Sequence, residues 1–195
     1  LDKGIIHYRT MLKDTPQTFN EYTPDNYGSI FKGPVQAWFA LGDSRNIPAI
    51  HLDRQLNDYD LYDFMKDCDV SNMKDKDYYG LSIVLGTCDV TMLELVEMYG
   101  ILANNGLYQK ANYVPLKKSP EKKRMLSKES SFIVRKMLEE NIPPYQNKPK
   151  DIVDIPVGYK TGTSIGFKDS WSVGIFDRYI IAVWIGNFNG QGNNS

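Results

Sequence analysis

A lysine, two threonines and a serine lie close together in the stretch Tyr159-Lys160-Thr161-Gly162-Thr163-Ser164. An ammonium group, hydroxyl groups and unpaired backbone N–H groups on one strand can bind a carboxylate and polarise a neighbouring carbonyl. Two strand-like segments follow directly, Asp169 to Phe176 and Tyr179 to Gly186, and their connection Asp177-Arg178 is short enough for an antiparallel hairpin. The stretch therefore predicts a substrate-binding strand at the edge of a cleft.

A second polar triplet, Ser44-Arg45-Asn46, lies much earlier in the chain, between two segments that we expect to be helical. Alone it is a weak signal, because a Ser-x-Asn triplet arises by chance about once in every one or two chains of this size. The Lys-Thr-Gly triplet is rarer, with roughly a few chance matches per hundred chains. Their order adds information, since a loop between helices and a later strand edge can form opposite walls of one cleft.

Glycine and proline positions predict the elements of the first half of the chain. Residues 1–33 should be irregular or strand-like, and Gly33-Pro34 should open a helix that ends at Gly42-Asp43. Pro48 should begin the next helix, and a short amphipathic helix should follow. The apolar residues that we expect to pack are Val35, Trp38, Phe39 and Leu41 in the first helix, and Leu61, Phe64, Met65 and Cys68 in the last.

The second half is expected to contain two longer helices before the final strands. One runs from Val90 to Asn104, with Asp89 as its N-cap and Asn105-Gly106 as a left-handed stop. Residues 117–128 are rich in lysine and predict a solvated loop. Ser127 then caps a helix that carries Phe132, Ile133, Met137 and Leu138. Prolines exclude regular structure from there to the final strands, at positions Pro143, Pro144, Pro149 and Pro156.

The composition is that of an ordinary globular chain, with 195 residues, 42% of them hydrophobic and 24% charged. A net charge of −1 argues against a nucleic-acid partner, and the longest apolar run is too short to cross a bilayer. Cys68, Cys88, His7 and His51 do not have the spacing of a metal cluster, so no metal or other cofactor is expected. The two cysteines are expected to be buried free thiols, although the sequence leaves a disulfide open.

The two triplets and several further stretches together resemble the transpeptidase domain of class A penicillin-binding proteins, closest to the type 1C branch. The resemblance covers nearly the whole chain and implies an α/β (α+β) fold shared with serine β-lactamases, an antiparallel sheet flanked by helices and incomplete at its N-terminus. Residues 1–187 would form this partial domain, and 188–195 a linker or cut end. The stretches that carry the resemblance are Gly33 to Val35, Ser44 to Ala49, Gly80 to Gly86, Leu102 to Gly106, Tyr159 to Ser164, Asp169 to Trp171 and Val183 to Asn187.

Three catalytic roles follow from the resemblance. Ser44 would act in the proton relay to and from the leaving and attacking amines. Asn46 would hydrogen-bond the catalytic lysine and the peptide amide of the substrate. Lys160 would keep the cleft positive and bond the Ser44 hydroxyl, which favours a substrate with an anionic terminus.

The resemblance also assigns the substrate-binding stretch. The hydroxyls of Thr161 and Thr163 would bind the terminal carboxylate of a D-Ala-D-Ala stem peptide or of a penicillin. The Thr163 backbone N–H would be one of two oxyanion-hole donors. Gly162 would let the substrate backbone lie close to the strand, because it has no side chain. Ser164 would belong to the same substrate-binding stretch.

The family further needs an S-x-x-K motif, whose serine is acylated and whose lysine is the candidate base. Three literal matches begin at Ser29, Ser71 and Ser119. The chemistry needs the serine and lysine one helical turn apart, but a Gly-Pro pair ends any helix directly after the first match. The other two follow the Ser-x-Asn triplet, which is the wrong order for the family. Residues 1–6 instead resemble the end of the helix that carries the motif, so we expect the nucleophile upstream and this chain to be inactive alone.

The implied function is a D,D-transpeptidase domain that cross-links peptidoglycan stem peptides by serine acyl transfer and binds β-lactams. The parent protein would also carry a glycosyltransferase domain and a membrane anchor, which places this region in the periplasm or on the extracytoplasmic face of the inner membrane. One alternative is a hydrolase of the same fold, a D,D-carboxypeptidase or β-lactamase, which product analysis of the parent would distinguish. Another is a non-catalytic module that binds stem peptides, which the upstream sequence would reveal.

Overall fold

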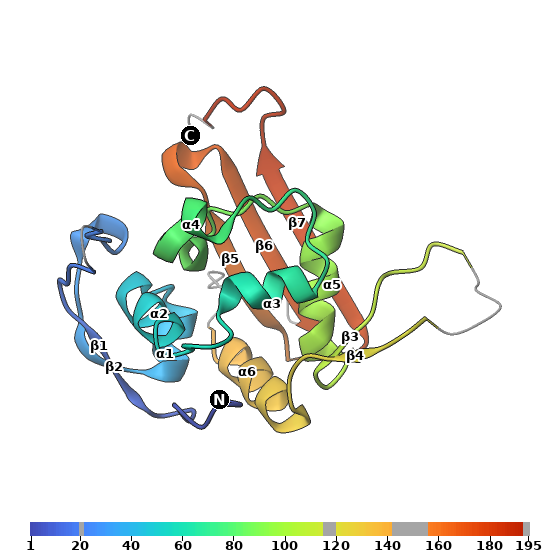
Figure 1. Ribbon diagram of the computed structural model, residues 1–195, viewed down its shortest axis with the longest axis horizontal. Coiled ribbons are helices and arrows are strands. Elements are labelled where there is room, and N and C mark those ends of the chain that lie inside the picture. The colour runs from blue at the N-terminus through green and yellow to red at the C-terminus, as the bar shows by residue number, and fades with distance from the viewer. Residues whose placement is uncertain (20–21, 115–119, 142–155, 193–195) are drawn as a thin grey trace, which may run out of the picture. The chain divides into compact units, whose positions relative to one another are not determined.

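The computed structural model describes residues 1–19, 22–114, 120–141 and 156–192, which form two compact units, residues 1–94 and 95–195 (Figure 1). The first unit contains β1 (Met11–Asp14), η1 (Tyr27–Ser29), β2 (Gly33–Gln36), α1 (Ala37–Gly42), α2 (Asn46–Asp53), α3 (Leu61–Asp67), α4 (Lys76–Tyr79) and η2 (Gly80–Leu85). Helix α5 (Met92–Ala103) starts at the end of this unit. The second unit continues with β3 (Leu107–Tyr108), β4 (Lys123–Arg124), α6 (Lys128–Glu139), β5 (Gly158–Thr163), η3 (Ile165–Phe167), β6 (Asp169–Phe176) and β7 (Tyr179–Gly186).

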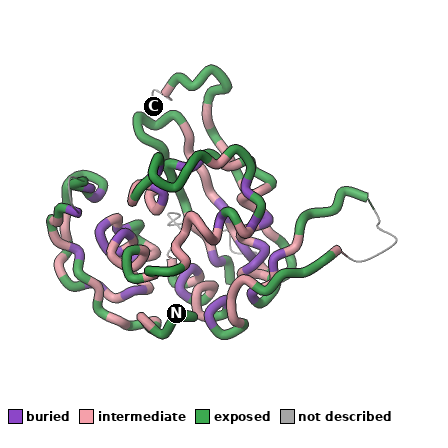
Figure 2. Tube along the Cα trace, in the orientation of Figure 1, coloured by how far each residue is buried: buried purple, intermediate pink, exposed green. Residues whose placement is uncertain are grey.

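The core of the first unit lies beneath the start of α2. Phe19, Ile47 and Ile50 are almost completely buried, and the partly buried side chains of Phe31, Leu81 and Leu85 pack against them. Figure 2 shows the buried positions on α1 and α2. Burial of large apolar side chains stabilises each by about 1.5–3 kcal/mol. The core therefore fixes the first turn of α2, which begins at Asn46, the last residue of the Ser44-Arg45-Asn46 triplet.

The expected helix start at Gly33-Pro34 is wrong. Both residues belong to β2, where Pro34 lies opposite Lys13 of β1, and α1 begins only at Ala37. Gly33 has a φ of +73°, a left-handed conformation that a right-handed helix does not contain. The cause is the pairing with β1, a partner distant in sequence that a local Gly-Pro signal does not reveal. The expected end of α1 at Gly42-Asp43 is confirmed.

Two other helix starts also differ from expectation. Helix α2 begins at Asn46 rather than at Pro48, which lies within its first turn. Helix α5 is capped by Thr91 rather than by Asp89. The Thr91 hydroxyl accepts from the Glu94 backbone N–H at 3.2 Å, and the Glu94 carboxylate accepts from the Thr91 N–H at 2.7 Å. This reciprocal pair is a capping box, whose sequence signature is the threonine followed three residues later by glutamate.

Several local expectations are confirmed. Helix α3 spans the predicted amphipathic segment, and Ser127 caps α6 by accepting from the Ser130 N–H at 3.0 Å. Asn105 and Gly106 have left-handed φ values of +54° and +87° directly after α5. No disulfide joins the two cysteines, and both are buried. Residues 1–6, by contrast, form turns and bends rather than a helix end.

The second unit is built on a three-stranded antiparallel sheet of order β5-β6-β7. Its hairpin has the predicted bounds, with Phe176 opposite Tyr179 across the Asp177-Arg178 turn. Helix α6 packs on β5, where a side chain at Gly158 would come within 3.2 Å of Leu138, and α6 and α5 lie beside the sheet in Figure 1. Close packing of α6 thus holds the strand that contains the Lys-Thr-Gly triplet.

The lysine-rich segment expected as a loop contains a short strand, because β4 pairs with β3. Pro143, Pro144 and Pro149 lie outside the described residues. Among the residues that the structure describes, no helix is long and apolar enough to cross a membrane. No group of His, Cys, Asp and Glu in the same described part could hold a metal ion. The fold is thus a mixed α/β arrangement of helices and antiparallel sheets.

Candidate active site

Ser44 lies in a tight turn that ends α1 with left-handed geometry. Its φ is +52°, its N–H donates to Leu41 O at 3.3 Å, and the Arg45 N–H donates to Ala40 O at 2.9 Å. These two bonds form a Schellman motif, in which the left-handed position is usually glycine. A serine there costs about 1–2 kcal/mol. The surrounding structure must therefore hold this exposed serine in place.

Asn46 is tied to the segment before η1 by two hydrogen bonds. Its backbone N–H donates to Asn26 Oδ1 at 2.9 Å, and its Nδ2 donates to Asp25 O at 2.6 Å. The side-chain amide is thereby held in one orientation at the start of α2. Such a fixed amide suits the predicted role of Asn46, because an orienting group must itself be held by its neighbours.

The Lys-Thr-Gly triplet lies on β5, the strand at one edge of the described sheet. Its register places Lys160 opposite Val173 and Thr163 opposite Ser170. The ladder continues one pair further, since the Ser164 N–H donates to Asp169 O at 2.9 Å. Hydrogen-bonded and non-hydrogen-bonded pairs alternate in an antiparallel ladder. The backbone N–H and C=O groups of Thr161 and Thr163 therefore point away from β6, toward the outer edge of the strand.

The side chains along this edge are open. Thr161, Gly162 and Thr163 are exposed. The Lys160 ammonium donates to Thr161 O at 2.9 Å, so it folds back along the same edge. A side chain at Gly162 would meet only Trp171 Cβ, at 4.0 Å, and its φ is not in the left-handed region. No contact among the described residues therefore requires glycine at this position.

Ser164 differs from its neighbours because its hydroxyl is engaged within the following loop. It donates to Asp169 Oδ2 at 3.0 Å and accepts from the Asp169 N–H at 2.8 Å. The other carboxylate oxygen of Asp169 accepts from Trp184 Nε1 at 3.0 Å. These bonds close the loop after β5 and anchor it to β7. A substrate-binding role for Ser164 stays a prediction, and donation of its hydroxyl proton to a substrate would break its bond to Asp169 Oδ2.

The Ser-x-Asn turn belongs to the first unit and the Lys-Thr-Gly strand to the second. Within the first unit the structure brings Ser44 and Asn46 together at one turn. Within the second it aligns Lys160, Thr161 and Thr163 along one strand edge. Sequence reasoning missed the buried contacts of Arg45, whose partners lie far away in the sequence.

The two S-x-x-K matches that the structure describes do not have the geometry of a nucleophile and its base. Ser29 has a φ of +55°, its hydroxyl donates to the Asp25 carboxylate, and η1 ends at this residue. The ammonium of Lys32 instead pairs with Asp43 at 3.1 Å. The match beginning at Ser71 forms a turn. The match beginning at Ser119 lies outside the described residues.

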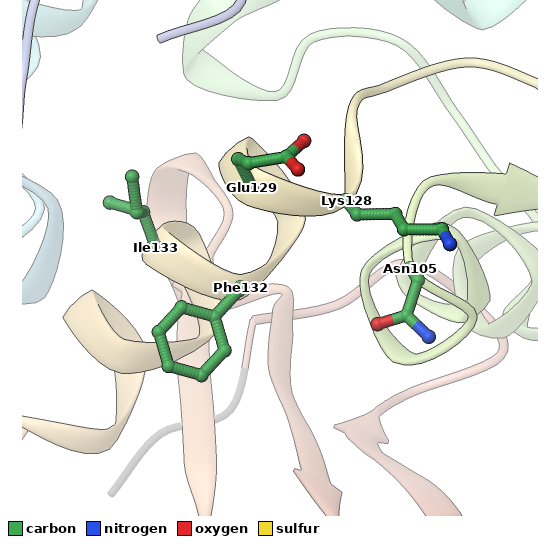
Figure 3. A pocket seen from close by; sticks show the side chains of 5 residues that line it. All are labelled: Asn105, Lys128, Glu129, Phe132 and Ile133. Carbon is green, nitrogen blue, oxygen red and sulfur yellow. The ribbon is translucent and has the colours of Figure 1, made fainter.

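The second unit also has a hollow of about 450 Å³ that contains none of the predicted site residues. Asn105 and four residues at the start of α6 line it, and it is wide open to solvent. Figure 3 shows that the side chains of Glu129, Phe132 and Ile133 fan out along the helix and do not converge on one point. The hollow therefore does not have the arrangement of a binding site, in which a few polar groups converge.

Comparison with known proteins agrees with this fold. The E. coli (strain K12) penicillin-binding protein 1C is 28% identical over 97% of this chain and 24% of its own length. The chain thus spans about a quarter of the length of the first curated relatives that it matches. Two solved structures from Mycobacterium tuberculosis share the fold. The first is PonA1 in complex with penicillin V, with a TM-score of 0.75 and 19% identity over 97% of this chain and 57% of that one. The second is the imipenem acyl-enzyme of penicillin-binding protein A, with a TM-score of 0.73 and 15% identity over 99% of this chain and 52% of that one.

The family match extends over nearly all of the sequence. Residues 1–193 match the family described as "Penicillin binding protein transpeptidase domain". This range includes both the Ser-x-Asn turn on the first unit and the Lys-Thr-Gly strand on the second. The chain therefore belongs to the penicillin-binding protein transpeptidase family.

Proposed function

We propose that this chain is the C-terminal part of a D,D-transpeptidase domain in a longer, bifunctional penicillin-binding protein. In this proposal the domain cross-links peptidoglycan stem peptides that end in D-Ala-D-Ala, and β-lactams bind in their place. The parent carries a glycosyltransferase domain and a membrane anchor ahead of this region. The domain works in the periplasm or on the extracytoplasmic face of the inner membrane.

The observation that carries the proposal is the outer edge of β5. Thr161 and Thr163 present hydroxyls, and their backbone groups point away from β6. Gly162 lies between them although packing does not require a glycine there. An extended peptide can add to such an edge by main-chain hydrogen bonds. The two hydroxyls then bind the terminal carboxylate, and the Thr163 N–H stabilises the oxyanion.

The reaction is acyl transfer in two steps. The oxygen of an upstream serine attacks the carbonyl carbon of the penultimate D-Ala, and the C–N bond to the terminal D-Ala breaks. Ser44 passes the proton that the upstream serine loses to the leaving amine, while Asn46 holds the peptide amide and Lys160 keeps the cleft positive. An amine of a second stem peptide then attacks the ester, its C–O bond breaks, and the serine regains a proton.

The upstream position of the nucleophile gives the first test, which uses a fluorescent penicillin. The 195-residue chain should not form a covalent adduct, because neither described S-x-x-K match has the required helical geometry. The longer protein should be labelled stoichiometrically. Labelling of the short chain that Ser29→Ala abolishes would refute this placement. Products from the longer protein should be cross-linked dimers, whereas hydrolysed stem peptides alone would indicate a carboxypeptidase.

The role of the β5 edge is tested by Gly162→Ala in the longer protein. The new methyl group meets only Trp171 Cβ in the fold, so stability should change by less than about 1 kcal/mol. The rate of acylation by penicillin should fall at least about tenfold, because the methyl group occupies the place of the ligand backbone. Gly174→Ala is the matched control on β6, where the new Cβ finds Val157 Cγ1 at 3.5 Å. Unchanged acylation of the Gly162 variant would exclude this edge as the binding surface.

A further inference from the structure

A buried polar network lies against the Ser44 turn and has no role in the reaction described so far. Its centre is Asp14, the last residue of β1, which is fully buried. Arg45 and Asn26, its two side-chain partners, are also buried, at 7% and 4% exposure. Charged groups are rarely buried to this degree unless they are paired and hydrogen-bonded. The network therefore fixes the segments that it joins, because its buried groups depend on one another for their hydrogen bonds.

The first arm of the network connects Asp14 to Arg45. Asp14 Oδ2 accepts from Arg45 Nε at 2.9 Å, and Arg45 Nη2 forms an ion pair with the same oxygen at 2.9 Å. The same oxygen accepts from the Lys32 N–H at 3.0 Å, and Arg45 Nη2 also donates to the carbonyl of Ile30. A planar guanidinium with several fixed bonds can occupy only one position. The backbone that directly follows Ser44 is thereby held.

The second arm reaches the other end of the triplet. Asp14 Oδ1 accepts from Asn26 Nδ2 at 2.7 Å. Asn26 Oδ1 in turn accepts from the backbone N–H of Asn46 at 2.9 Å. One carboxylate thus fixes the arginine side chain through one oxygen and the Asn46 backbone through the other. Between these anchors and α1, Ser44 has little freedom to leave its left-handed conformation.

We propose that Asp14 and Asn26 are positioning residues that hold the Ser44 hydroxyl and the Asn46 amide in register for proton transfer. The proposal rests on the proposed function, since it assumes that Ser44 delivers a proton to the leaving amine. In this proposal neither Asp14 nor Asn26 touches the substrate, because both are buried. Their effect reaches the reaction through the backbone of residues 44–46. Catalytic groups need such support, because a displacement of about 1 Å can cost about 100-fold in rate.

A purely structural role for the network predicts a different result. Donors with different leaving groups distinguish a structural role from a positioning role. An amine leaves only after it gains a proton, whereas a thiol, with a pKa of about 8.5, leaves readily as thiolate. A variant that folds incompletely, or whose structure is loosened throughout, should be acylated more slowly by amide and thioester donors alike. Loss of Ser44 positioning should slow the amide donor selectively.

The experiment compares acylation of the longer protein by an amide donor and by a thioester donor with the same acyl group. The main variant is Asn26→Ala, which removes the second arm and leaves the Asp14–Arg45 pair intact. Asp14→Asn is the second variant, and Ser44→Ala gives the reference pattern for a lost proton relay. Asp43→Asn is the control, because Asp43 is an exposed carboxylate that contacts Arg45 at 3.4 Å but is not bonded to Asp14.

We expect Asn26→Ala to slow the amide donor at least about tenfold and the thioester donor by less than about twofold, as in Ser44→Ala. The control should change neither rate by more than about twofold. Equal losses with both donors, or no loss with either, would overturn the positioning role. Failure of the proposed function looks different, because the unaltered longer protein would then be acylated by neither donor or would release only hydrolysed products.

Discussion

Replacing Glu94 by Gln should reduce the free energy of unfolding at pH 7 by about 1.5 kcal/mol, because Glu94 closes the capping box of α5. Its carboxylate accepts from the Ser71 N–H at 2.6 Å and from the Thr91 N–H and hydroxyl at 2.7 and 2.8 Å. Burial works against ionisation, but the hydrogen bonds from Thr91 and Ser71 outweigh it and lower the pKa of Glu94 to about 2.

The size of the effect follows from this pKa. A fall from 4.5 to about 2 corresponds to roughly 3.4 kcal/mol at 1.36 kcal/mol per pKa unit. Because Glu94 is only partly buried, solvent screening reduces this to about half. Glutamine also keeps one acceptor oxygen for the Ser71 or Thr91 N–H. These two reductions give the expected loss of about 1.5 kcal/mol.

The sign of the pH dependence is fixed by the lowered pKa. The unfolded chain takes up the proton first as the pH falls, so the contribution of Glu94 is complete above about pH 4.5 and disappears toward about pH 2. The difference in stability between the protein and its Glu94→Gln variant should therefore shrink over this window. Urea unfolding at a series of pH values measures the difference, and ¹³C NMR of the carboxyl group measures the pKa directly.

Glu129→Gln is the matched control for this experiment. Glu129 also lies in the first turn of a helix, but there the Ser127 hydroxyl caps the N–H of Ser130. Only its interaction with the helix dipole is lost, which costs a few tenths of a kcal/mol. A Glu94 pKa near 4.5, or a stability difference that stays constant from pH 7 to pH 2.5, would refute the reasoning.

Two further predictions concern the turn after α5 and the cysteines. Gly106→Ala should destabilise the protein by more than about 3 kcal/mol in urea unfolding, because its φ is +87° and the new Cβ would lie 2.0 Å from a backbone carbonyl oxygen. Gly190→Ala, at a φ of +72° with no atom within 4 Å, should cost only about 1 kcal/mol; similar losses for both would contradict the argument. Cys68 and Cys88, buried at 2% and 8% exposure, should react with a thiol reagent only at the rate of unfolding, and fast labelling in native buffer would count against their burial.

Local sequence signals predicted well the elements whose caps and turns depend on adjacent residues. The Asp177-Arg178 turn, the Ser127 cap and the Asn105-Gly106 stop all have the expected positions. Elements that depend on distant partners were predicted poorly. The Gly33-Pro34 stretch forms a strand because β1 pairs with it, and nothing within the stretch indicates that β1 is its partner.

The sequence pattern also does not predict which face of the sheet is covered. Strand β7 is apolar at nearly every position, so alternation cannot indicate which of its faces is covered. The structure leaves Ile181, Val183 and Ile185 about half exposed or more, at 52%, 49% and 63%, while Val173 and Ile175 of the neighbouring strand are buried. Which apolar side chains form the core is a property of packing rather than of pattern.

The sequence by itself determined the chemistry available to this protein. The Ser-x-Asn triplet, the Lys-Thr-Gly triplet and their order predict the residue types of a transpeptidase site, because hydroxyl, amide and ammonium groups are fixed by residue identity. The tertiary structure alone decided how each group is held. Ser44 adopts a left-handed conformation directly before Arg45, which a carboxylate of β1 binds, and Thr163 turns its N–H to an open edge because of its ladder register with β6. Hydrogen bonds between residues far apart in the chain set these orientations, and no local pattern encodes them.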